Sequence, residues 1–325
     1  MKAVLCKSWG PPDALAVEDV PSPSPGRGQI LVSVKASGVN FTDVLIVQGK
    51  YQIKPELPFT PGGEIAGIVK QVGEGVHGYM PGDGVMALTG LGGFAEEVVI
   101  DETRVAPLPL GIDFKVAASF GVAYASSYHA LKDRAALQPG ETLLVLGAAG
   151  GVGLAAVELG NLMGARVIAC ASSDDKLQIC KRHGAKIVIN YEREDLRETV
   201  RHLTVNWGVD VVFDPVGGKY TEPALRGMAR NGRYLVIGFA AGEIPRIPLN
   251  IALLKSCSII GVFWGDFAKR EPAANAGNLK ELTAWLRAGK ITPLVSATYR
   301  LERAADALND LMNRKVLGKV ALVTG

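Results

Sequence analysis

The sequence predicts an α/β protein with two parts, a partly closed antiparallel β-barrel followed by a doubly wound parallel sheet. Its 325 residues suggest two domains, at roughly 150 residues per domain. The first hundred residues contain short apolar runs separated by Gly and Pro, which is typical of antiparallel strands. From Thr142 onward, nearly continuous apolar runs alternate with helical segments, which is typical of a parallel sheet covered on both faces.

The composition argues against several classes of protein. The chain is 48% hydrophobic and 21% charged, so it can bury a core and is not disordered. A net charge of +3 without clustered Lys and Arg does not favour a nucleic-acid or membrane surface. The most apolar window, residues 143–159, is interrupted by glycines and Glu158, so we do not expect it to span a membrane.

The N-terminus and the cysteines indicate a compartment. The chain enters a strand pattern at Met1–Leu5, without the basic head and apolar stretch of a secretion signal. The four cysteines are scattered and form no C-x-x-C motif. We therefore expect a reduced, cytoplasmic protein.

In the first part, three apolar runs predict strands. These runs are Ile30–Ala36, Ile65–Val72 and Phe94–Ile100. The Pro-Gly-Asp-Gly sequence at 81–84 predicts a turn, and Pro-Ser-Pro-Ser-Pro at 21–25 predicts a rigid lead-in.

In the second part, strands and helices alternate in sequence. The predicted strands are Thr142–Gly147, Arg166–Ala171, Ile187–Asn190, Val209–Asp214, Tyr234–Gly238 and Ser258–Phe263, with helices from Val152 and near Asp174. After about residue 266 the pattern predicts helix Leu279–Ala288, strand Val295–Tyr299, helix Leu301–Asn313 and strand Lys319–Val323. Periodicity alone leaves open whether this tail extends the parallel sheet or returns to the first part.

A glycine-rich segment follows the first strand of the second part. It matches the dinucleotide fingerprint G-x-G-x-x-G with alanine at the first glycine position. Gly150 would let the backbone approach a pyrophosphate, and Gly153 would let the helix pack close to the strand. The helix N-terminus supplies free N–H groups for that anion. The predicted phosphate-binding residues are Ala148, Ala149, Gly150, Gly151, Val152 and Gly153.

The end of the second strand favours NADPH over NADH. An NAD-selective site places Asp or Glu there, but this sequence has Ala171, followed by Ser172 and Ser173. Small hydroxyls can donate to a 2′-phosphate, and Lys176 can supply a counter-charge. An alternative interpretation is that Ser173 caps the helix that starts at Asp174, and the two interpretations are compatible.

With these motifs in one order, the chain resembles the medium-chain dehydrogenase/reductase superfamily, most closely its zinc-free quinone oxidoreductase branch, which includes zeta-crystallin. The resemblance covers essentially the whole chain. Its most specific segments are Gly38–Asp43, Pro61–Gly67, Ala148–Gly153 and Asp214–Gly218.

The resemblance implies a domain plan and an assembly. Residues 1–121 would form a GroES-like barrel, 122–266 a Rossmann domain, and 267–325 a return to the barrel. The cofactor would lie in the cleft between the two domains. Homodimers or homotetramers would form through an edge strand, for which Ser258–Phe263 is the candidate.

The resemblance also bears on metal binding. In zinc alcohol dehydrogenases of this superfamily a Cys and a His ligate the catalytic metal. Here Asn40 stands at the Cys-like position and Gly63 at the His-like position, and the four-cysteine structural lobe is missing. Neither residue supplies a thiolate, imidazole or carboxylate, so we expect no metal site.

Further contacts are implied by the resemblance, residue by residue. Tyr191 would lie near the adenosine phosphate, Gly238 and Phe239 near the nicotinamide ribose, Phe263 and Trp264 near the nicotinamide, Ser126 near its amide, and Lys319 in the adenosine-phosphate pocket.

The hypothesis for function is hydride transfer from NADPH to a quinone or related electron-poor carbonyl compound, without zinc. The candidate catalytic residues are Asn40, Asp43, Tyr51 and Ser126, and all but Asp43 are candidate hydrogen-bond donors to the developing oxyanion. Asp43 could instead be a helix cap or part of a buried pair. Two alternatives stay open: an NADPH-dependent enone or enoyl-thioester double-bond reductase, and a nucleotide-binding or RNA-binding protein with little catalysis.

Overall fold

Residues 1–324 are described by a computed structural model, whose contacts divide the chain into two compact units. Unit 1 comprises Met1–Val122 together with the chain from Pro293 onward, and unit 2 comprises Ala123–Thr292. The return to the first unit therefore begins at Pro293 and not at residue 267 as predicted. The reason is helix α10 (Pro272–Arg287), whose Trp285 ring packs 5.3 Å from the Tyr128 ring within unit 2.

Unit 1 is built mainly from strands. Its strands are β1 (Lys2–Leu5), β2 (Ala16–Asp19), β3 (Gln29–Val39), β4 (Glu64–Val72), β5 (Gly84–Ala87), β6 (Glu97–Asp101), β7 (Val105–Pro107), β14 (Val295–Arg300) and β15 (Lys319–Val323). Its helices are α1 (Phe41–Val47), α2 (Phe114–Ala117) and α11 (Ala304–Met312). The predicted strand from Phe94 begins only at Glu97, because the Phe94 backbone bonds to Val4 and Pro61 instead.

Strand β3 organises the seven-stranded sheet of unit 1. Six strands follow the order β14-β15-β3-β4-β5-β7, and the seventh, β6, also pairs with β3. One edge of β3 pairs antiparallel with β4, while β6 and β15 share its other edge in succession. The apolar residues that alternate along these strands, among them Ile30, Val32 and Ile65, form the core of the sheet.

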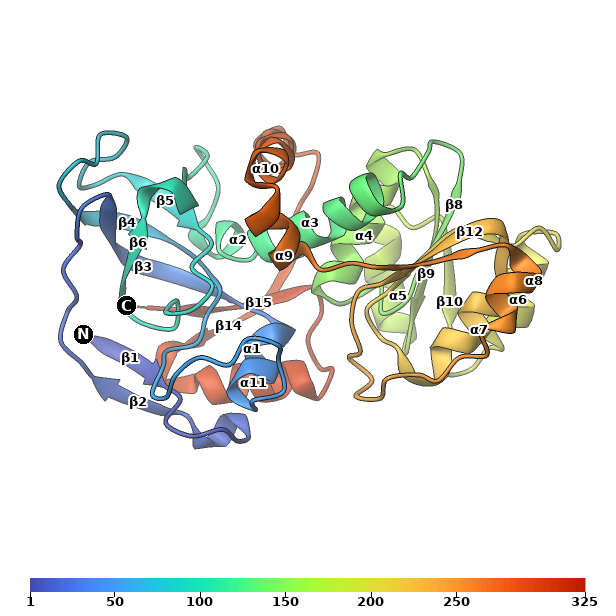
Figure 1. Ribbon diagram of the computed structural model, residues 1–325, viewed down its shortest axis with the longest axis horizontal. Helices are drawn as coiled ribbons and strands as arrows, with labels where there is room; N and C mark the ends of the chain where they lie inside the picture. The colour runs from blue at the N-terminus through green and yellow to red at the C-terminus, as the bar shows by residue number, and fades with distance from the viewer. Residues whose placement is uncertain (325) are drawn as a thin grey trace. The chain divides into compact units, whose positions relative to one another are not determined.

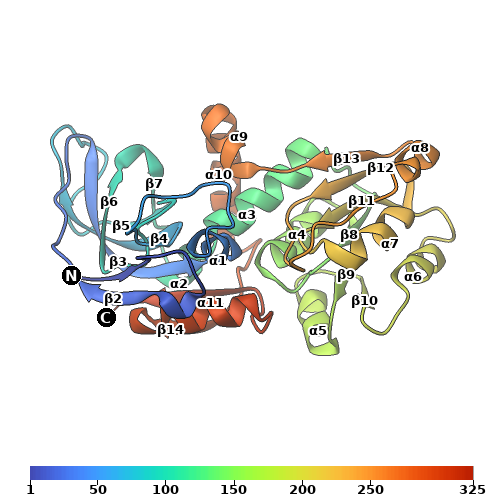
Figure 2. The same ribbon diagram turned by 60° about the horizontal axis from the view of Figure 1, so that its bottom comes forward.

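The last segment of the chain completes unit 1. Strand β15 pairs with β3 so that Val320 lies opposite Val39, and Figure 1 shows the red β15 beside the blue β3. Helix α11 packs beside α1, as Figure 2 shows. Of the two courses left open for the tail, the structure takes the return to the first unit.

Unit 2 alternates strands with helices (Figure 1). Its strands are β8 (Thr142–Val145), β9 (Arg166–Ala171), β10 (Ile187–Asn190), β11 (Val209–Asp214), β12 (Met228–Val236) and β13 (Ser258–Gly261). Its helices are α3 (Gly121–Tyr128, whose first two residues belong to unit 1), α4 (Gly151–Leu162), α5 (Asp174–Arg182), α6 (Leu196–Leu203), α7 (Thr221–Arg226), α8 (Asn250–Lys255), α9 (Trp264–Arg270) and α10.

The sheet of unit 2 is parallel throughout, with strand order β10-β9-β8-β11-β12-β13. From β8 the chain runs outward through β9 to β10, then crosses back to β11 and runs outward the other way. With right-handed crossovers, α4 and α5 cover one face, and α6 and α7 the other. The direction of winding reverses between β8 and β11, where α/β sheets bind their ligands.

The helices of the described chain are short or polar relative to a membrane span. In residues 1–324, no helix is both long enough and apolar enough to cross a membrane.

Candidate active site

The glycine-rich segment forms a tight turn between β8 and α4, at the point where the winding of the sheet reverses. Gly147 adopts a φ of +57°, which a side chain disfavours, so the turn glycine precedes the fingerprint position held by Ala148. A Cβ on Gly153 would lie 2.2 Å from the carbonyl oxygen of Gly147. The helix therefore packs against the turn as closely as backbone permits.

The start of α4 is suited to an anion. Gly150 is the N-cap residue and carries no side chain that could occupy the N–H groups of the first turn. Those groups lie at the positive end of a 12-residue helix. The cradle fits a pyrophosphate, because a larger residue at Gly150 or Gly153 would fill it or displace the helix.

The end of β9 carries hydroxyls and a lysine and no carboxylate. Ala171 is buried, Ser172 and Ser173 are half-buried, and the Lys176 ammonium donates a 3.2 Å hydrogen bond to the Ser172 hydroxyl. Ser173 occupies the N-cap position of α5, but its side chain does not accept a hydrogen bond from the helix. The capping interpretation is therefore right about the position of Ser173 and wrong about its side-chain hydrogen bond.

Asp174 follows these serines, and its charge is compensated. Its carboxylate accepts hydrogen bonds from Asn190 at 3.0 Å and from Arg193 at 2.9 Å. The Asn190 amide and the Arg193 guanidinium hold the pKa of Asp174 below its ordinary value. The partners of this charged carboxylate are thus the last residue of β10 and a residue shortly after that strand.

Tyr191 follows β10, next to the end of β9. Its backbone N–H donates to the carbonyl of Ala171 at 3.3 Å, and its ring centroid lies 4.2 Å from that of Tyr220. The hydroxyl of Tyr220 donates to Glu192. Tyr191 is therefore brought to the same edge of the sheet as Ser172 and Lys176.

The loops after β11 and β12 are joined through Asp214. Its carboxylate accepts from the N–H groups of Val216 and Gly217 at 2.8 Å, and from the Tyr234 hydroxyl at 2.5 Å. Its carbonyl accepts the N–H of Gly238 at 3.3 Å. Sequence reasoning missed this role, although a lone Asp at the end of an apolar strand indicates a buried group that needs partners.

The aromatic residues predicted near the nicotinamide differ in exposure. Phe239 and Phe263 are exposed at 37% and 49%, while Trp264 is half-buried at the start of α9. The indole N–H of Trp264 donates to Asn275 Oδ1 at 2.9 Å, which ties α9 to α10. The two phenylalanines are thus the more exposed of these three aromatic rings.

Helix α3 is tied to the glycine segment by Ser127, the neighbour of the predicted residue Ser126. The hydroxyl of Ser127 donates to the Val152 carbonyl at 2.8 Å. Ser126 is half-buried on the same helix. The sequence contains both serines, but only the structure distinguishes the one that supports α4.

In unit 1, Asn40 lies at the centre of a buried polar cluster. The Asn40 side-chain amide donates to Glu64 Oε1 at 2.9 Å, and its backbone N–H donates to Asp43 Oδ2 at 2.8 Å. The Lys319 ammonium donates to Glu64 Oε1 at 2.9 Å and also to Asn40 Oδ1. Strands β3, β4 and β15 bring these residues together from three distant parts of the chain.

The prediction for Lys319 does not fit this arrangement. Its ammonium has three protons, and Glu64, Asn40 and the Val39 carbonyl accept all three. The residue is 5% exposed within unit 1. Lys319 is therefore committed to the cluster and is not available to a nucleotide phosphate.

Asp43 is both a capping residue and a buried acid. It lies in the first turn of α1 and accepts from the N–H of Asn40, the N-cap residue. Burial and the charge of Glu64 raise the pKa of Asp43 to about 7, although the Asn40 hydrogen bond and the charge of Lys319 oppose this shift.

Tyr51 lies in another part of unit 1. It packs, half-buried, against an apolar cluster that includes Cys6, Ile46 and Phe59. Burial raises the pKa of the Tyr51 phenol. The contacts of Tyr51 are thus with this apolar cluster, whereas those of Asn40 are with charged groups.

Side chains that could ligate a metal ion do not gather at one place in the described residues. Among residues 1–324, no three His, Cys, Asp or Glu side chains gather to form a metal site. Gly63 is half-buried and lies beside Glu64, and as a glycine it offers no side-chain donor atom at the His-like position.

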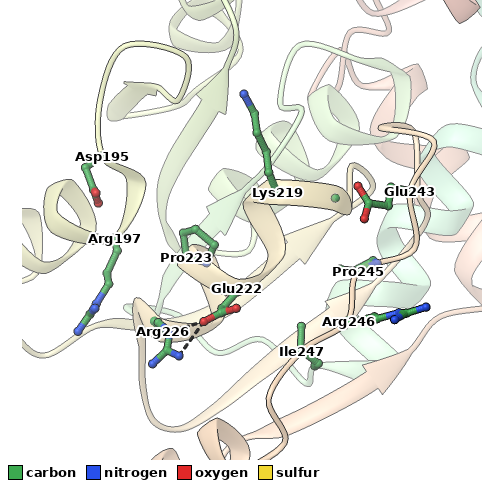
Figure 3. A pocket seen from close by; sticks show the side chains of 11 residues that line it. Asp195, Arg197, Lys219, Glu222, Pro223, Arg226, Glu243, Pro245, Arg246 and Ile247 are labelled. Atoms are coloured by element: carbon green, nitrogen blue, oxygen red, sulfur yellow. Dashed lines mark hydrogen bonds and ion pairs between the residues drawn. The ribbon is translucent and has the colours of Figure 1, made fainter.

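Unit 2 also contains an open groove of about 660 Å³, shown in Figure 3. Charged residues of α6, α7 and the segment 243–247 line it, and Glu222 forms an ion pair with Arg226 at 2.7 Å. Figure 3 shows the side chains of Arg197, Lys219 and Arg246 pointing in different directions. None of the predicted cofactor-binding residues lines this groove.

Comparisons with known proteins agree with this architecture. Residues 26–110 match the family model of the alcohol dehydrogenase GroES-like domain, and residues 151–279 match the model described as zinc-binding dehydrogenase. A quinone oxidoreductase-like protein 2 homolog of Nematostella vectensis is 41% identical over 99% of this chain and 89% of that protein.

Solved structures are similar over the full length. Escherichia coli quinone oxidoreductase complexed with NADPH matches with a TM-score of 0.93 at 30% identity, covering 100% of both chains. The CurK enoyl reductase matches with a TM-score of 0.90 at 26% identity, covering 100% of this chain and 99% of that one. The chain belongs to the medium-chain dehydrogenase/reductase superfamily, in its quinone oxidoreductase branch, and is an oxidoreductase. The predicted family and fold class are confirmed.

Proposed function

We propose that this protein is an NADPH-dependent reductase that passes hydride to a quinone or a related electron-poor carbonyl compound, without zinc. The observation that carries the proposal is the edge of the unit 2 sheet. There, an uncovered helix N-terminus lies beside a strand end that offers Ser172 and Lys176 in place of a carboxylate. Relatives named quinone oxidoreductase, one of them solved with NADPH, support the same choice.

Different residues of unit 2 would bind different parts of the cofactor. The N–H groups at Gly150, Gly151 and Val152 would bind the pyrophosphate, with Ala148, Ala149 and Gly153 shaping the turn. Ser172, Ser173 and Lys176 would bind the 2′-phosphate, with Tyr191 beside them. Gly238, Phe239, Phe263, Trp264 and Ser126 would serve the nicotinamide end. Bound NADPH supplies the hydride.

The zinc-free part of the proposal rests on Asn40 and Gly63. An amide and a hydrogen atom stand where a metal enzyme of this superfamily has a thiolate and an imidazole. Charge that develops on the acceptor oxygen would then be stabilised by hydrogen-bond donors, for which Asn40, Tyr51 and Ser126 are the candidates. Stoichiometric zinc in the purified protein, together with turnover that a chelator abolishes, would contradict this part.

Steady-state NADPH oxidation tests the function. We expect NADPH oxidation with 1,4-benzoquinone as the acceptor. The rate and the product should be the same in metal-free buffer. Crotonyl-CoA serves as the enoyl-thioester probe and 2-cyclohexenone as the simple enone. Inactivity with all three acceptors would defeat the reductase proposal.

The similarity to CurK enoyl reductase favours an enone or enoyl-thioester reductase as the second candidate. Quinones and enones require the same hydride geometry, so the ranking of kcat/KM decides between them. A higher value for crotonyl-CoA than for benzoquinone would select the second candidate.

We also propose that two copies associate through β13. This strand forms an edge of the unit 2 sheet in the described chain, and its exposed backbone can pair with a second copy of itself. Leu253 and Leu254 of the adjacent helix α8 are 79% and 77% exposed. We expect a dimer by light scattering, and a monomer after Leu253→Glu combined with Leu254→Glu. A wild-type monomer would contradict the proposal.

A further inference from the structure

The side-chain amide of Asn40 lies between two buried charges of opposite sign. Lys319 donates to its oxygen, and its nitrogen donates to Glu64 Oε1 at 2.9 Å. Lys319 and Glu64 are themselves an ion pair at 2.9 Å, and both are at most 5% exposed. The three residues thus form a closed triangle of charge-assisted hydrogen bonds.

This triangle allows only one orientation of the amide. A rotation by 180° would turn the NH₂ group toward the ammonium and the oxygen toward the carboxylate. Both contacts would then be repulsive, in an environment where water screens little of the charge. An asparagine at the surface has no such constraint, because water satisfies either orientation.

The orientation leaves one N–H of Asn40 available. One proton of the NH₂ group points to Glu64, and the other has the Gly38 carbonyl at 3.5 Å, longer than the usual range of about 2.7–3.2 Å. Asn40 is 9% exposed, more than Asp43, Glu64 or Lys319 in the same cluster. A fixed amide with a weakly used N–H is suited to donate to a substrate oxygen.

The position of Glu64 is fixed in turn by backbone. Its second oxygen accepts the N–H of Val122 at 3.0 Å. Gly38 makes room for the carboxylate, since a Cβ there would lie 2.7 Å from Glu64 Oε1 and 2.0 Å from the Ala118 carbonyl oxygen. Glu64 is thus held by the sheet and by the first turn of α3, and it in turn fixes the orientation of the Asn40 amide.

We propose that Lys319 and Glu64 are positioning residues, which hold the Asn40 amide in a single orientation toward the acceptor. This proposal rests on the function proposed above. It gives Lys319 and Glu64 a role in the reaction that does not depend on contact with a nucleotide. Glu64 begins β4, Lys319 begins β15, and the two meet only because β3 pairs with both strands.

A double-substitution cycle separates positioning from a purely structural role. The variants are Glu64→Gln, Lys319→Met and the two combined, all close in shape to the original side chains. Each single variant leaves one member of the Lys319–Glu64 ion pair without its partner, whereas the combined variant removes both members. Lys70→Met is the matched control, because Lys70 of unit 1 pairs with Glu97 at the surface.

Stability and turnover are measured on the same preparations. We expect both single variants to lose thermal stability and the combined variant to regain most of it. The kcat with benzoquinone should fall about 100-fold in the singles and stay low in the combined variant, because neither charge then orients the amide. KM and the NADPH dissociation constant should change by no more than about twofold, since the interaction acts in the transition state.

Three outcomes would count as failures, and they can be told apart. If kcat recovers together with stability in the combined variant, the ion pair only supports the fold and the positioning role is wrong. If the wild-type protein turns over none of the acceptors, the proposed function fails, and the positioning role fails with it. Unchanged kcat in both single variants also overturns the positioning role, while leaving the reductase proposal intact.

Discussion

Nδ1 of His183 lies 2.7 Å from Oε1 of Glu158, an acid buried in the middle of helix α4. The Thr292 hydroxyl donates to the same carboxylate at 2.8 Å, and the Tyr124 hydroxyl donates to its other oxygen. Glu158 thus joins α4 to α3, to the end of α5 and to the segment before β14. Because α4 begins at the phosphate-binding turn, this network fixes the helix that presents the turn.

Glu158→Gln is expected to destabilise unit 2 by about 3 kcal/mol at neutral pH, since it weakens a buried, fully hydrogen-bonded charge. Burial would raise the pKa of Glu158, but the hydrogen bonds of His183, Tyr124 and Thr292 hold it below its ordinary value. The stabilisation is therefore present above the unfolded-state pKa and is lost as pH falls through the folded-state value. Urea unfolding at pH 7 and pH 4 measures both effects.

The control for this prediction is Glu222→Gln, which removes an exposed ion pair with Arg226. That variant should lose less than about 1 kcal/mol. A loss for Glu158→Gln that is as small, or that grows toward acidic pH, would contradict the assigned role.

The choice of NADPH over NADH is expected to depend on the end of β9. Lys176→Ala should weaken NADPH binding about tenfold and leave NADH binding unchanged, because it removes a charge that only a 2′-phosphate needs. Ser172→Asp should act in the same direction by repulsion. Quenching of the four tryptophans reports both titrations. The control is Lys181→Ala, in the last turn of the same helix; equal losses for both cofactors would refute the assignment.

The phosphate-binding turn should not tolerate a side chain at Gly153. In Gly153→Ala the new Cβ would meet the Gly147 carbonyl oxygen at 2.2 Å and Ala148 Cα at 2.9 Å, both backbone atoms. We expect α4 to shift and NADPH affinity to fall by about two orders of magnitude. Gly277→Ala, in α10, meets nothing within 4 Å and should be neutral or stabilising. Wild-type affinity in Gly153→Ala would show that the turn does not hold the cofactor.

Asp43 gives the stability of unit 1 a pH dependence. Its pKa in the folded protein is about 7, above the ordinary 3.8, because of burial. Between these values the folded state binds more protons than the unfolded state, so stability falls as pH rises through the window and levels off above it.

Asp43→Asn removes this dependence. The stability of the variant relative to the wild type should therefore rise between pH 4 and pH 7, by about 4 kcal/mol in all. Thermal unfolding across this range tests the slope, with exposed Asp101→Asn as the control. Parallel curves for Asp43→Asn and the wild type would show that Asp43 ionises normally.

Local patterns predicted most of unit 2. Strands β9, β10 and β11 have the predicted bounds, because each is a largely apolar run bounded by polar residues or glycine. The fingerprint could be predicted because its glycines are required by close contacts with residues only a few positions away in the sequence. Strand β12 is longer than predicted and begins at Met228, since its first residues are mixed in polarity.

The cluster around Asn40 was beyond such patterns. Asn40 was singled out, but its partners Glu64 and Lys319 are 24 and 279 residues away, and only strand pairing joins them. A signal was nevertheless present. Each of these two charges begins a strand and is followed directly by apolar residues, and a charge at a buried position requires an opposite charge nearby. Glu158 carries the same signal inside an apolar helix.

The split of unit 1 across the chain has a consequence for synthesis. Unit 2 is one continuous stretch, whereas the central strand β3 lacks part of its edge until β15 has been made. A nascent chain can thus finish its nucleotide-binding half on the ribosome while the other half waits with an unpaired edge. Chains that terminate before β15 should therefore aggregate or bind chaperones through the residues that are translated first.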